Sequence, residues 1–282
     1  MKTALALGTF DGLHSGHRAV LDATKAFYSV AVTFEIPPKA IITGKPQLLM
    51  LPDDRANRLK SLGINRVEMQ NFCDVKFLSP KEYFEKLKEK YKPDRIVCGF
   101  NYRFGKDAKG DTTMLQELCH SEGIEFVCIP PVKQNETVIS STALRKLISE
   151  GKIEEATHQI YGGFAFVAPV LHGDARGRTL GFPTINQEYP ELLAQAKFGV
   201  YISRVTVDGV EYDAITNVGL RPTFKTEKVG CETYIKDFSE DIYGKNVRTE
   251  LLRFVRDEQK FDCVQQLKNA IENDVKSLDA YK

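Results

Sequence analysis

Hydrophobic residues follow two alternating spacings in the first half of the chain. Short apolar runs, each long enough for one buried strand, are followed by segments whose apolar residues recur three and four positions apart. Strands are expected at residues 5–10, 28–34, 66–69, 95–98 and 124–129, and helices at residues 17–27, 53–62, 113–122 and 141–149. This alternation predicts an α/β fold, a parallel sheet covered by helices.

Start signals mark one of these helices and a further one. Asp53 or Asp54 occupies the position of an N-cap before residues 53–62. A further helix is expected to begin at Ser79, because Ser79-Pro80-Lys81-Glu82 has the serine, early proline and glutamate of a capping box.

From about Ile160 the pattern changes to short, closely spaced runs of β-branched and aromatic residues. These runs are separated by turn signals such as Asp208-Gly209 and lie at residues 164–170, 200–207, 211–217, 232–238 and 248–254. They predict a small antiparallel barrel, followed by an amphipathic helix over residues 261–281. The boundary is expected between Gly151 and Gly163, which gives domains of residues 1–158 and 159–282.

Composition excludes several partners. The formal net charge is +1, and 42% hydrophobic with 27% charged residues is ordinary for a globular protein. We therefore expect small-molecule substrates, with neither nucleic acid nor membrane as a partner, while the oligomeric state stays open. No signal peptide or spanning segment is recognisable. The six dispersed cysteines form no CxxC pair, which favours buried thiols and a cytoplasmic location.

The first candidate site is the decapeptide Gly8-Thr9-Phe10-Asp11-Gly12-Leu13-His14-Ser15-Gly16-His17, which follows an apolar run. It places two imidazoles at a strand-to-helix turn, where backbone N–H groups and the helix dipole favour an anion. A pair of ordinary surface histidines is the alternative. Zinc is not expected, because no further His or Cys lies at ligand spacing nearby.

A second element of the first half is Ser140-Ser141-Thr142, followed one turn later by Arg145. Hydroxyls at the start of a helix can simply cap it. Hydroxyls together with a guanidinium one turn away also form a good phosphate clamp.

In the second half, Gly173, Gly177 and Gly181 lie among arginines that include Arg178. An exposed loop leading to a strand is one interpretation; a loop folded over phosphates is the other. Thr184 and Asn186 are two positions apart, so their side chains share one face of a strand. Their oxygens could hold a Mg²⁺ ion that bridges ATP phosphates.

These motifs resemble two families. The HxGH and SSTxxR signatures are similar to those of the HxGH nucleotidylyltransferases, which have a Rossmann-like sheet. The string GTFDGLHSGH and residues 99–106 narrow the resemblance to the bacterial bifunctional riboflavin kinase/FAD synthetases. The resemblance implies transfer of AMP from ATP to FMN, giving FAD and pyrophosphate. It assigns ATP and transfer chemistry to Gly8, Phe10, Asp11, His14, Gly16, His17, Ser140, Ser141, Thr142 and Arg145, and the flavin side to Asn101 and Arg103.

One segment departs from this family. The family often has a TFxPHP-like sequence after the second strand, whereas residues 33–38 read Thr-Phe-Glu-Ile-Pro-Pro and contain no histidine. That segment borders the flavin in the family.

The second half resembles riboflavin kinases in its barrel and C-terminal helix. The family motif GRGxxLGxPTAN is matched with Ile185 in place of alanine, and an ETxxxDF element begins at Glu232. The match implies that Glu232 is the general base acting on riboflavin, with Mg²⁺ on Thr184 and Asn186. It also assigns ATP contacts to Gly173, Arg178, Thr184 and Asn186, and flavin contacts to Asp237, Tyr243 and Arg256.

The sequence thus predicts a bifunctional enzyme that converts riboflavin to FMN and FMN to FAD with two ATP molecules, each by in-line attack on phosphorus. One alternative is that only the kinase half is active. Another is a regulator that binds a flavin or nucleotide without catalysis, which would not need the base Glu232.

Overall fold

A computed structural model of the chain describes residues 2–44, 47–134, 137–173, 177, 181–222 and 227–281. The chain divides into two compact units, Met1–Ala143 and Leu144–Lys282. Helix α6 (Ser141–Ser149) crosses this division, and the short helix α7 (Ile153–Thr157) follows it.

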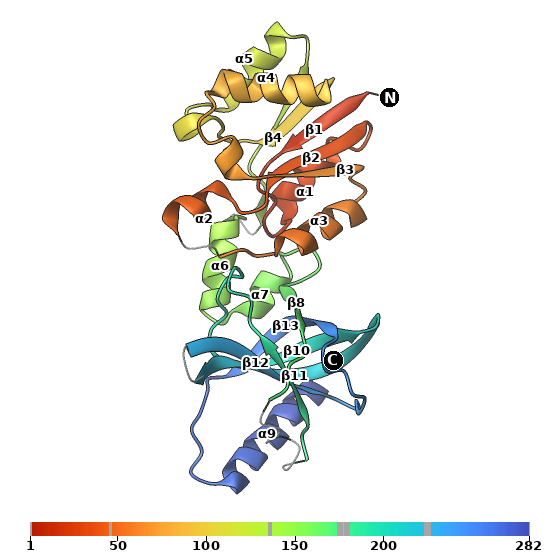
Figure 1. Ribbon diagram of the computed structural model, residues 1–282, viewed down its shortest axis with the longest axis vertical. Coiled ribbons are helices and arrows are strands. Elements are labelled where there is room, and N and C mark those ends of the chain that lie inside the picture. Colours follow the sequence, from red (N-terminus) through yellow and green to blue (C-terminus); the bar gives the residue numbers. More distant parts are fainter. Residues whose placement is uncertain are drawn as a thin grey trace. The chain divides into compact units, whose positions relative to one another are not determined.

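Unit 1 is built on a five-stranded sheet in the order β3-β2-β1-β4-β5, and every neighbouring pair is parallel (Figure 1). The predicted parallel sheet is therefore confirmed. Its strands are β1 (Thr3–Leu7), β2 (Tyr28–Phe34), β3 (Arg66–Gln70), β4 (Arg95–Gly99) and β5 (Glu125–Ile129).

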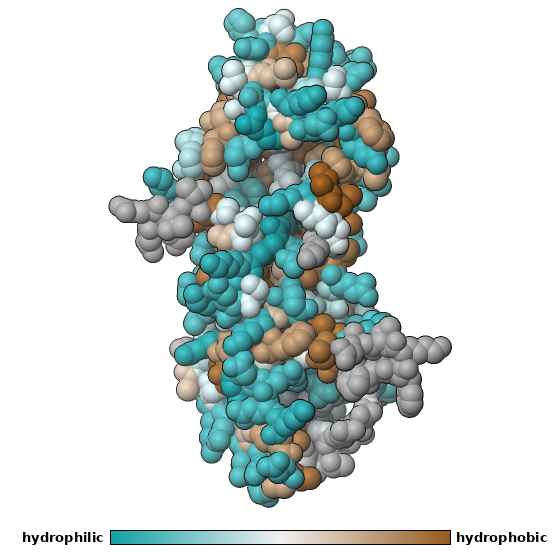
Figure 2. All heavy atoms as spheres, turned by 90° about the vertical axis from the view of Figure 1, so that its left-hand side faces the viewer, coloured by the Kyte–Doolittle hydropathy of each residue, from teal (hydrophilic) through white to brown (hydrophobic). Residues whose placement is uncertain are grey.

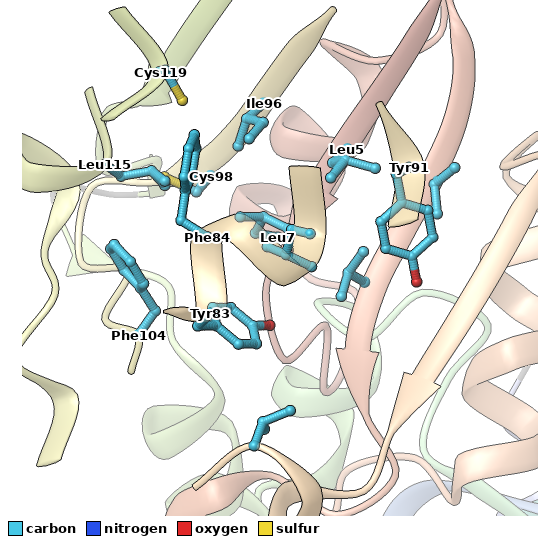
Figure 3. Close-up of a cluster of buried hydrophobic side chains, with 14 residues drawn as sticks. Leu5, Leu7, Tyr83, Phe84, Tyr91, Ile96, Cys98, Phe104, Leu115 and Cys119 are labelled. Carbon is cyan, nitrogen blue, oxygen red and sulfur yellow. The ribbon is translucent and has the colours of Figure 1, made fainter. Parts of the chain in front are cut away.

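Alternation along β1 divides the core of unit 1 into two faces. Leu5 and Leu7 point into a cluster with Tyr83 and Phe84, which also includes side chains of the fifth helix (Figure 3). Ala4 and Ala6 point the other way and are fully buried. Both faces of the sheet are thus covered, as a parallel sheet requires.

Helices account for this cover, with α4 and α5 on the face of Leu5 (Figure 1). The capping box predicted at Ser79 is present at the start of α4. The helices are α1 (Ser15–Asp22), α2 (Pro38–Thr43), α3 (Pro52–Ser61), α4 (Pro80–Tyr91) and α5 (Thr112–Ser121), with 3₁₀ turns η1 (Phe72–Asp74) and η2 (Lys106–Ala108) and a small hairpin of β6 (Lys133–Gln134) and β7 (Thr137–Val138).

Three boundaries differ from the prediction. Strand β1 ends at Leu7, because Phe10 adopts a positive φ of 49° and cannot continue the strand. Helix α1 ends at Asp22, since the Thr24 hydroxyl donates to the Leu21 carbonyl in the turn that follows. The predicted N-cap at Asp53 or Asp54 is wrong: both lie in the first turn of α3, after the N-cap Leu51.

Unit 2 is built on a curled antiparallel sheet of six strands in the order β8-β13-β10-β11-β12-β9. An isolated antiparallel bridge between Leu171 and Asn186 brings the two ends of the sheet together. This confirms the predicted barrel-like architecture. Its strands are β8 (Ala165–Pro169), β9 (Thr184–Glu188), β10 (Gly199–Val207), β11 (Val210–Pro222), β12 (Glu227–Ile235) and β13 (Asn246–Arg256).

The predicted C-terminal helix is α9 (Val264–Asp279). Its last turns pack on the sheet through Val275 and Leu278, in a cluster with Val200 and Ile215. The rest of the sheet encloses a second cluster that includes Val205 and Val247.

The face of the molecule seen in Figure 2 is mostly hydrophilic, with hydrophobic side chains in small groups. Within the described residues, no helix is long and apolar enough to cross a membrane. All six cysteines are free thiols.

Candidate active sites

The turn from β1 to α1 is a strained loop. Phe10 and Leu13 have φ angles of 49° and 45°, which residues other than glycine seldom adopt, and both side chains are fully buried. Strain of this kind persists where the surroundings fix the backbone, and it gathers at functional sites. Here it brings the chain from the end of the strand to His14, the N-cap of α1.

The two histidines of the motif lie together at the start of α1. Their rings stack at 3.8 Å between centroids, and the Phe10 ring meets His17 edge-on at 5.5 Å. A side chain at Gly16 would crowd the His14 ring, since a Cβ there would lie 3.2 Å from its Cε1.

Burial sets the charge of this pair. It lowers the pKa of His14 to about 4 and lowers the pKa of His17 well below its usual range. Both imidazoles are therefore neutral at pH 7 without a ligand. Their Nδ1 atoms and the Ser15 hydroxyl are buried without a hydrogen-bond partner in the described part of the chain. Such groups at a helix N-terminus fit a bound anion.

Asp11 links the HxGH turn to two other segments of unit 1. Its Oδ1 accepts hydrogen bonds from the backbone N–H groups of Leu49 (2.8 Å) and Met50 (3.2 Å). Its carbonyl accepts a hydrogen bond from the Ser141 hydroxyl at 2.7 Å. The structure thus brings the start of α6 to the HxGH turn.

The other members of the second motif lie along the same helix. The Ser140 hydroxyl accepts a hydrogen bond from the Ala143 N–H at 3.2 Å, so it caps α6. Thr142 is exposed, and Arg145 follows one turn later on α6.

The flavin-side candidates lie after β4, next to β1 in the sheet. Asn101 and Arg103 are both exposed, and Arg103 Nη1 pairs with Asp111 Oδ2 at 3.3 Å. The order β3-β2-β1-β4-β5 reverses direction between β1 and β4. The histidine turn and the Asn101 loop therefore flank the switch point, where ligands of open parallel sheets bind.

Sequence reasoning missed Arg55, which is fully buried on α3. Its Nη2 donates to the carbonyls of Phe34 (2.5 Å) and Glu35 (2.7 Å). Its Nε and Nη1 are buried without a partner among the described residues. Arg55 thus fixes, through main-chain atoms, the start of the segment that departs from the TFxPHP pattern.

In unit 2, strand register gathers the kinase candidates. Glu232 of β12 pairs directly with Asn186 of β9, and Tyr234 pairs with Thr184. Residues two apart on a strand share one face, and paired side chains lie about 5 Å apart between Cβ atoms. All four line one cavity of about 350 Å³, within the size range of small-molecule sites.

The cavity also contains Arg256, together with apolar and aromatic side chains. The aromatic walls include Phe182, whose ring meets Tyr234 edge-on at 5.4 Å. Gly173 lies against the site, because a Cβ there would be 2.2 Å from Asn186 Nδ2. Gly177 lines the cavity, whereas Arg178 lies outside the described residues.

Two flavin candidates lie elsewhere. Tyr243 lines a second cavity of about 350 Å³ and stacks on His172 with 3.9 Å between ring centroids. Thr184 lines both cavities. Asp237, in a positive-φ turn after β12, is exposed and is not among the residues that line either cavity.

The fold and these sites define a class. A parallel sheet with a helix N-terminus and two imidazoles at its switch point suits a ligand that carries phosphates, such as a nucleotide. A strand face that combines a carboxylate with hydroxyl and amide oxygens suits phosphoryl transfer. The chain therefore has the form of a two-part nucleotide-dependent transferase.

Comparison with known proteins agrees with this class. The FAD synthetase family model matches residues 1–143, and the riboflavin kinase family model matches residues 163–282. A protein of Listeria monocytogenes named bifunctional riboflavin kinase/FMN adenylyltransferase is 31% identical, over 98% of this chain and 91% of its own. The Bacillus subtilis protein of that name is 30% identical, over 97% and 90%.

A solved structure is similar throughout. It comes from Streptococcus pneumoniae, is described as a macrolide-efflux protein and has 30% identity and a TM-score of 0.89, covering 100% of this chain and 94% of its own. The chain belongs to the bifunctional riboflavin kinase/FMN adenylyltransferase family.

Proposed function

We propose that this chain makes FAD from riboflavin in two steps, phosphorylation in unit 2 and adenylylation in unit 1. The observation that carries the proposal is the direct pairing of Glu232 with Asn186, next to Thr184, inside one cavity. Neutral histidines at the sheet's switch point support the second step. We propose residues 1–158 and 159–282 as the two functional parts.

In the kinase step, Glu232 takes the proton of the terminal ribityl hydroxyl while the resulting oxygen attacks the γ-phosphorus of ATP. The bond from that phosphorus to the β-phosphate oxygen breaks, and ADP leaves. The cavity's apolar and aromatic walls hold the flavin ring, with Arg256 beside it.

Mg²⁺ fits this site. The Thr184 hydroxyl and the Asn186 amide oxygen are hard ligands, and Mg²⁺ usually takes few protein ligands and completes its shell with water and phosphate oxygens. When bound, the ion would neutralise charge on the ATP phosphates. Thr184 lines both cavities, so its hydroxyl is open to a ligand in either of them. Gly173 and Arg178 are proposed ATP contacts, and Asp237 and Tyr243 stay predicted flavin contacts.

In the adenylyl step, an FMN phosphate oxygen attacks the α-phosphorus of a second ATP, and pyrophosphate leaves. His14 and His17 stabilise the developing charge, helped by the N–H groups that begin α1. Ser140, Ser141, Thr142 and Arg145 are the proposed triphosphate contacts of α6, together with Gly8, Phe10, Asp11 and Gly16 of the turn. Asn101 and Arg103 are proposed to hold the phosphate of FMN.

The departure at residues 33–38 is compatible with this step. Arg55 holds Phe34 and Glu35 by their carbonyl oxygens, so the backbone there does not depend on the missing histidine. The free thiols and the ATP requirement favour the cytoplasm as the location.

Chromatography of flavins tests the proposal, after purified protein is incubated with riboflavin, ATP and Mg²⁺. FMN followed by FAD is expected. FMN alone would leave a riboflavin kinase whose first half is inactive, with residues 35–38 as the first region to repair. Neither product from folded protein would favour the non-catalytic regulator.

A further inference from the structure

Helix α9 buries a charge next to the flavin cavity. Its buried residues are Leu278 and Asp274, which is only 4% exposed. Burying a carboxylate is costly unless it is paired and hydrogen-bonded. An apolar residue would dock the helix at lower cost. Packing alone therefore does not explain why Asp274 lies on the buried face of α9.

The partner of Asp274 is Arg256, at the end of β13. Arg256 Nε donates to Oδ1 at 2.9 Å and Nη2 donates to Oδ2 at 2.8 Å, a two-point contact that fixes the guanidinium plane. The remaining terminal nitrogen reaches the Asp257 carbonyl at 3.3 Å. The Phe261 ring lies 5.8 Å from the guanidinium carbon.

Both members of the pair line the cavity that contains Glu232. From α9, Leu267 and Ile271 line it too, one turn apart and on the same side as Asp274. These two apolar side chains are only half-buried. The wall made by α9 thus offers apolar surface and a flat, charge-balanced guanidinium to whatever enters.

This chemistry suits a planar, uncharged ring. A guanidinium stacks on π systems and donates to ring carbonyls in its plane. Because the carboxylate balances its charge, the pair offers little extra attraction for a phosphate. An unpaired arginine would be free to turn towards the phosphates of ATP.

We propose that Asp274 is a positioning residue for flavin binding, which holds the Arg256 plane at the cavity wall and balances its charge there. This inference rests on the proposed kinase function of the cavity. Asp274 acts through Arg256 and touches neither reacting oxygen nor phosphorus.

The test compares two substitutions on the same helix in the full-length protein. Asp274→Asn removes the charge of the positioning carboxylate. Asp279→Asn is the matched control, since Asp279 pairs with Lys236 in an exposed ion pair and is not among the residues lining the cavity. Kinase activity is measured as the sum of FMN and FAD formed, and riboflavin affinity is measured without ATP by quenching of flavin fluorescence.

For Asp274→Asn, KM and Kd for riboflavin should rise about tenfold, the loss typical of a buried charged hydrogen bond. The kcat and the KM for Mg-ATP should change less than about twofold, because the proposed role of Arg256 includes no contact with phosphate. FMN adenylylation by the first half should not change. Asp279→Asn should match the wild-type protein in every measurement.

Equal rises in both KM values, or a fall in kcat alone, would mean that α9 has simply loosened, and would overturn the inference. So would the same result for Asp279→Asn. If Asp274→Asn does not fold, Arg256→Lys decides: lysine keeps the charge without the plane, so unchanged riboflavin affinity would also refute the role. A wild-type protein that makes no FMN would refute the proposed kinase itself, whatever the variants do.

Discussion

Protonation of His14 offers a direct test of the adenylyl site. The folded-state pKa is about 4 against an ordinary value of 6.5. The unfolded chain therefore binds this proton more readily, so the stability due to a neutral His14 is complete above pH 6.5 and is lost as the pH falls towards 4.

The size of the effect follows from these two values. Two pH units below the unfolded pKa correspond to a loss on the order of 3 kcal/mol, since one pKa unit is worth about 1.4 kcal/mol. Partial protonation of the folded state at about pH 4.5 reduces this loss only slightly, to about 2–3 kcal/mol. In His14→Gln, the acid-induced loss of unit 1 stability should be smaller than in the wild-type protein by about this amount. His120→Gln, on the exposed side of α5, is the control and should keep the full loss.

Two assays read this out on the full chain. NMR of imidazole protons resolves the five histidines, with His14→Gln to assign the signal. Urea unfolding, above pH 6.5 and again at about pH 4.5, gives the free energy of unfolding of unit 1 under each condition. Inorganic pyrophosphate should raise the His14 midpoint, because a bound anion favours the imidazolium. A midpoint near 6.5 in the free protein, or one that pyrophosphate leaves unchanged, would refute the buried anion site.

Other substitutions separate the two sites. Glu232→Gln should lower FMN formation at least about a hundredfold and leave FMN adenylylation intact; parallel loss of both would contradict two independent sites. Thr184→Ala should raise the Mg²⁺ concentration needed for FMN formation only, and an unchanged Mg²⁺ titration would remove it from the metal site. Arg55→Met leaves two carbonyls unpaired, so adenylylation should be inactivated at a lower temperature, with a loss of about 2 kcal/mol or more. The temperature at which kinase activity is lost in the same samples is the control. An unshifted adenylylation curve would show that Arg55 does not stabilise unit 1.

The sequence predicted the sheets well because each side-chain pattern matches its environment. Leu5 and Leu7 lie on one face of β1 and Ala4 and Ala6 on the other, which gives the continuous apolar run of a buried parallel strand. The end of that strand was misplaced because the backbone at Phe10 turns to a positive φ. No local preference announces such a turn in an aromatic residue.

For a similar reason, the sequence predicted some contacts within the candidate sites and not others. Thr184 and Asn186 alternate, so a shared face follows from strand geometry alone. Their meeting with Glu232 depends on the β9–β12 register, which is set by tertiary packing. Residues named by resemblance, such as Asp237, have no pattern of their own that would place them.

The two charges that the sequence did not single out, Arg55 and Asp274, share a physical feature. Each is buried, and each binds a fixed group: two backbone carbonyls for Arg55, a guanidinium for Asp274. A charged residue on a helix is usually solvated, so propensity gives no warning. Spacing does for Asp274, because Ile271, Asp274, Val275 and Leu278 form the i, i+3, i+4, i+7 stripe of a buried helix face. A carboxylate inside such a stripe must find a cation or leave the core. The carboxylate of α9 finds Arg256 of β13, which lines the cavity that contains Glu232.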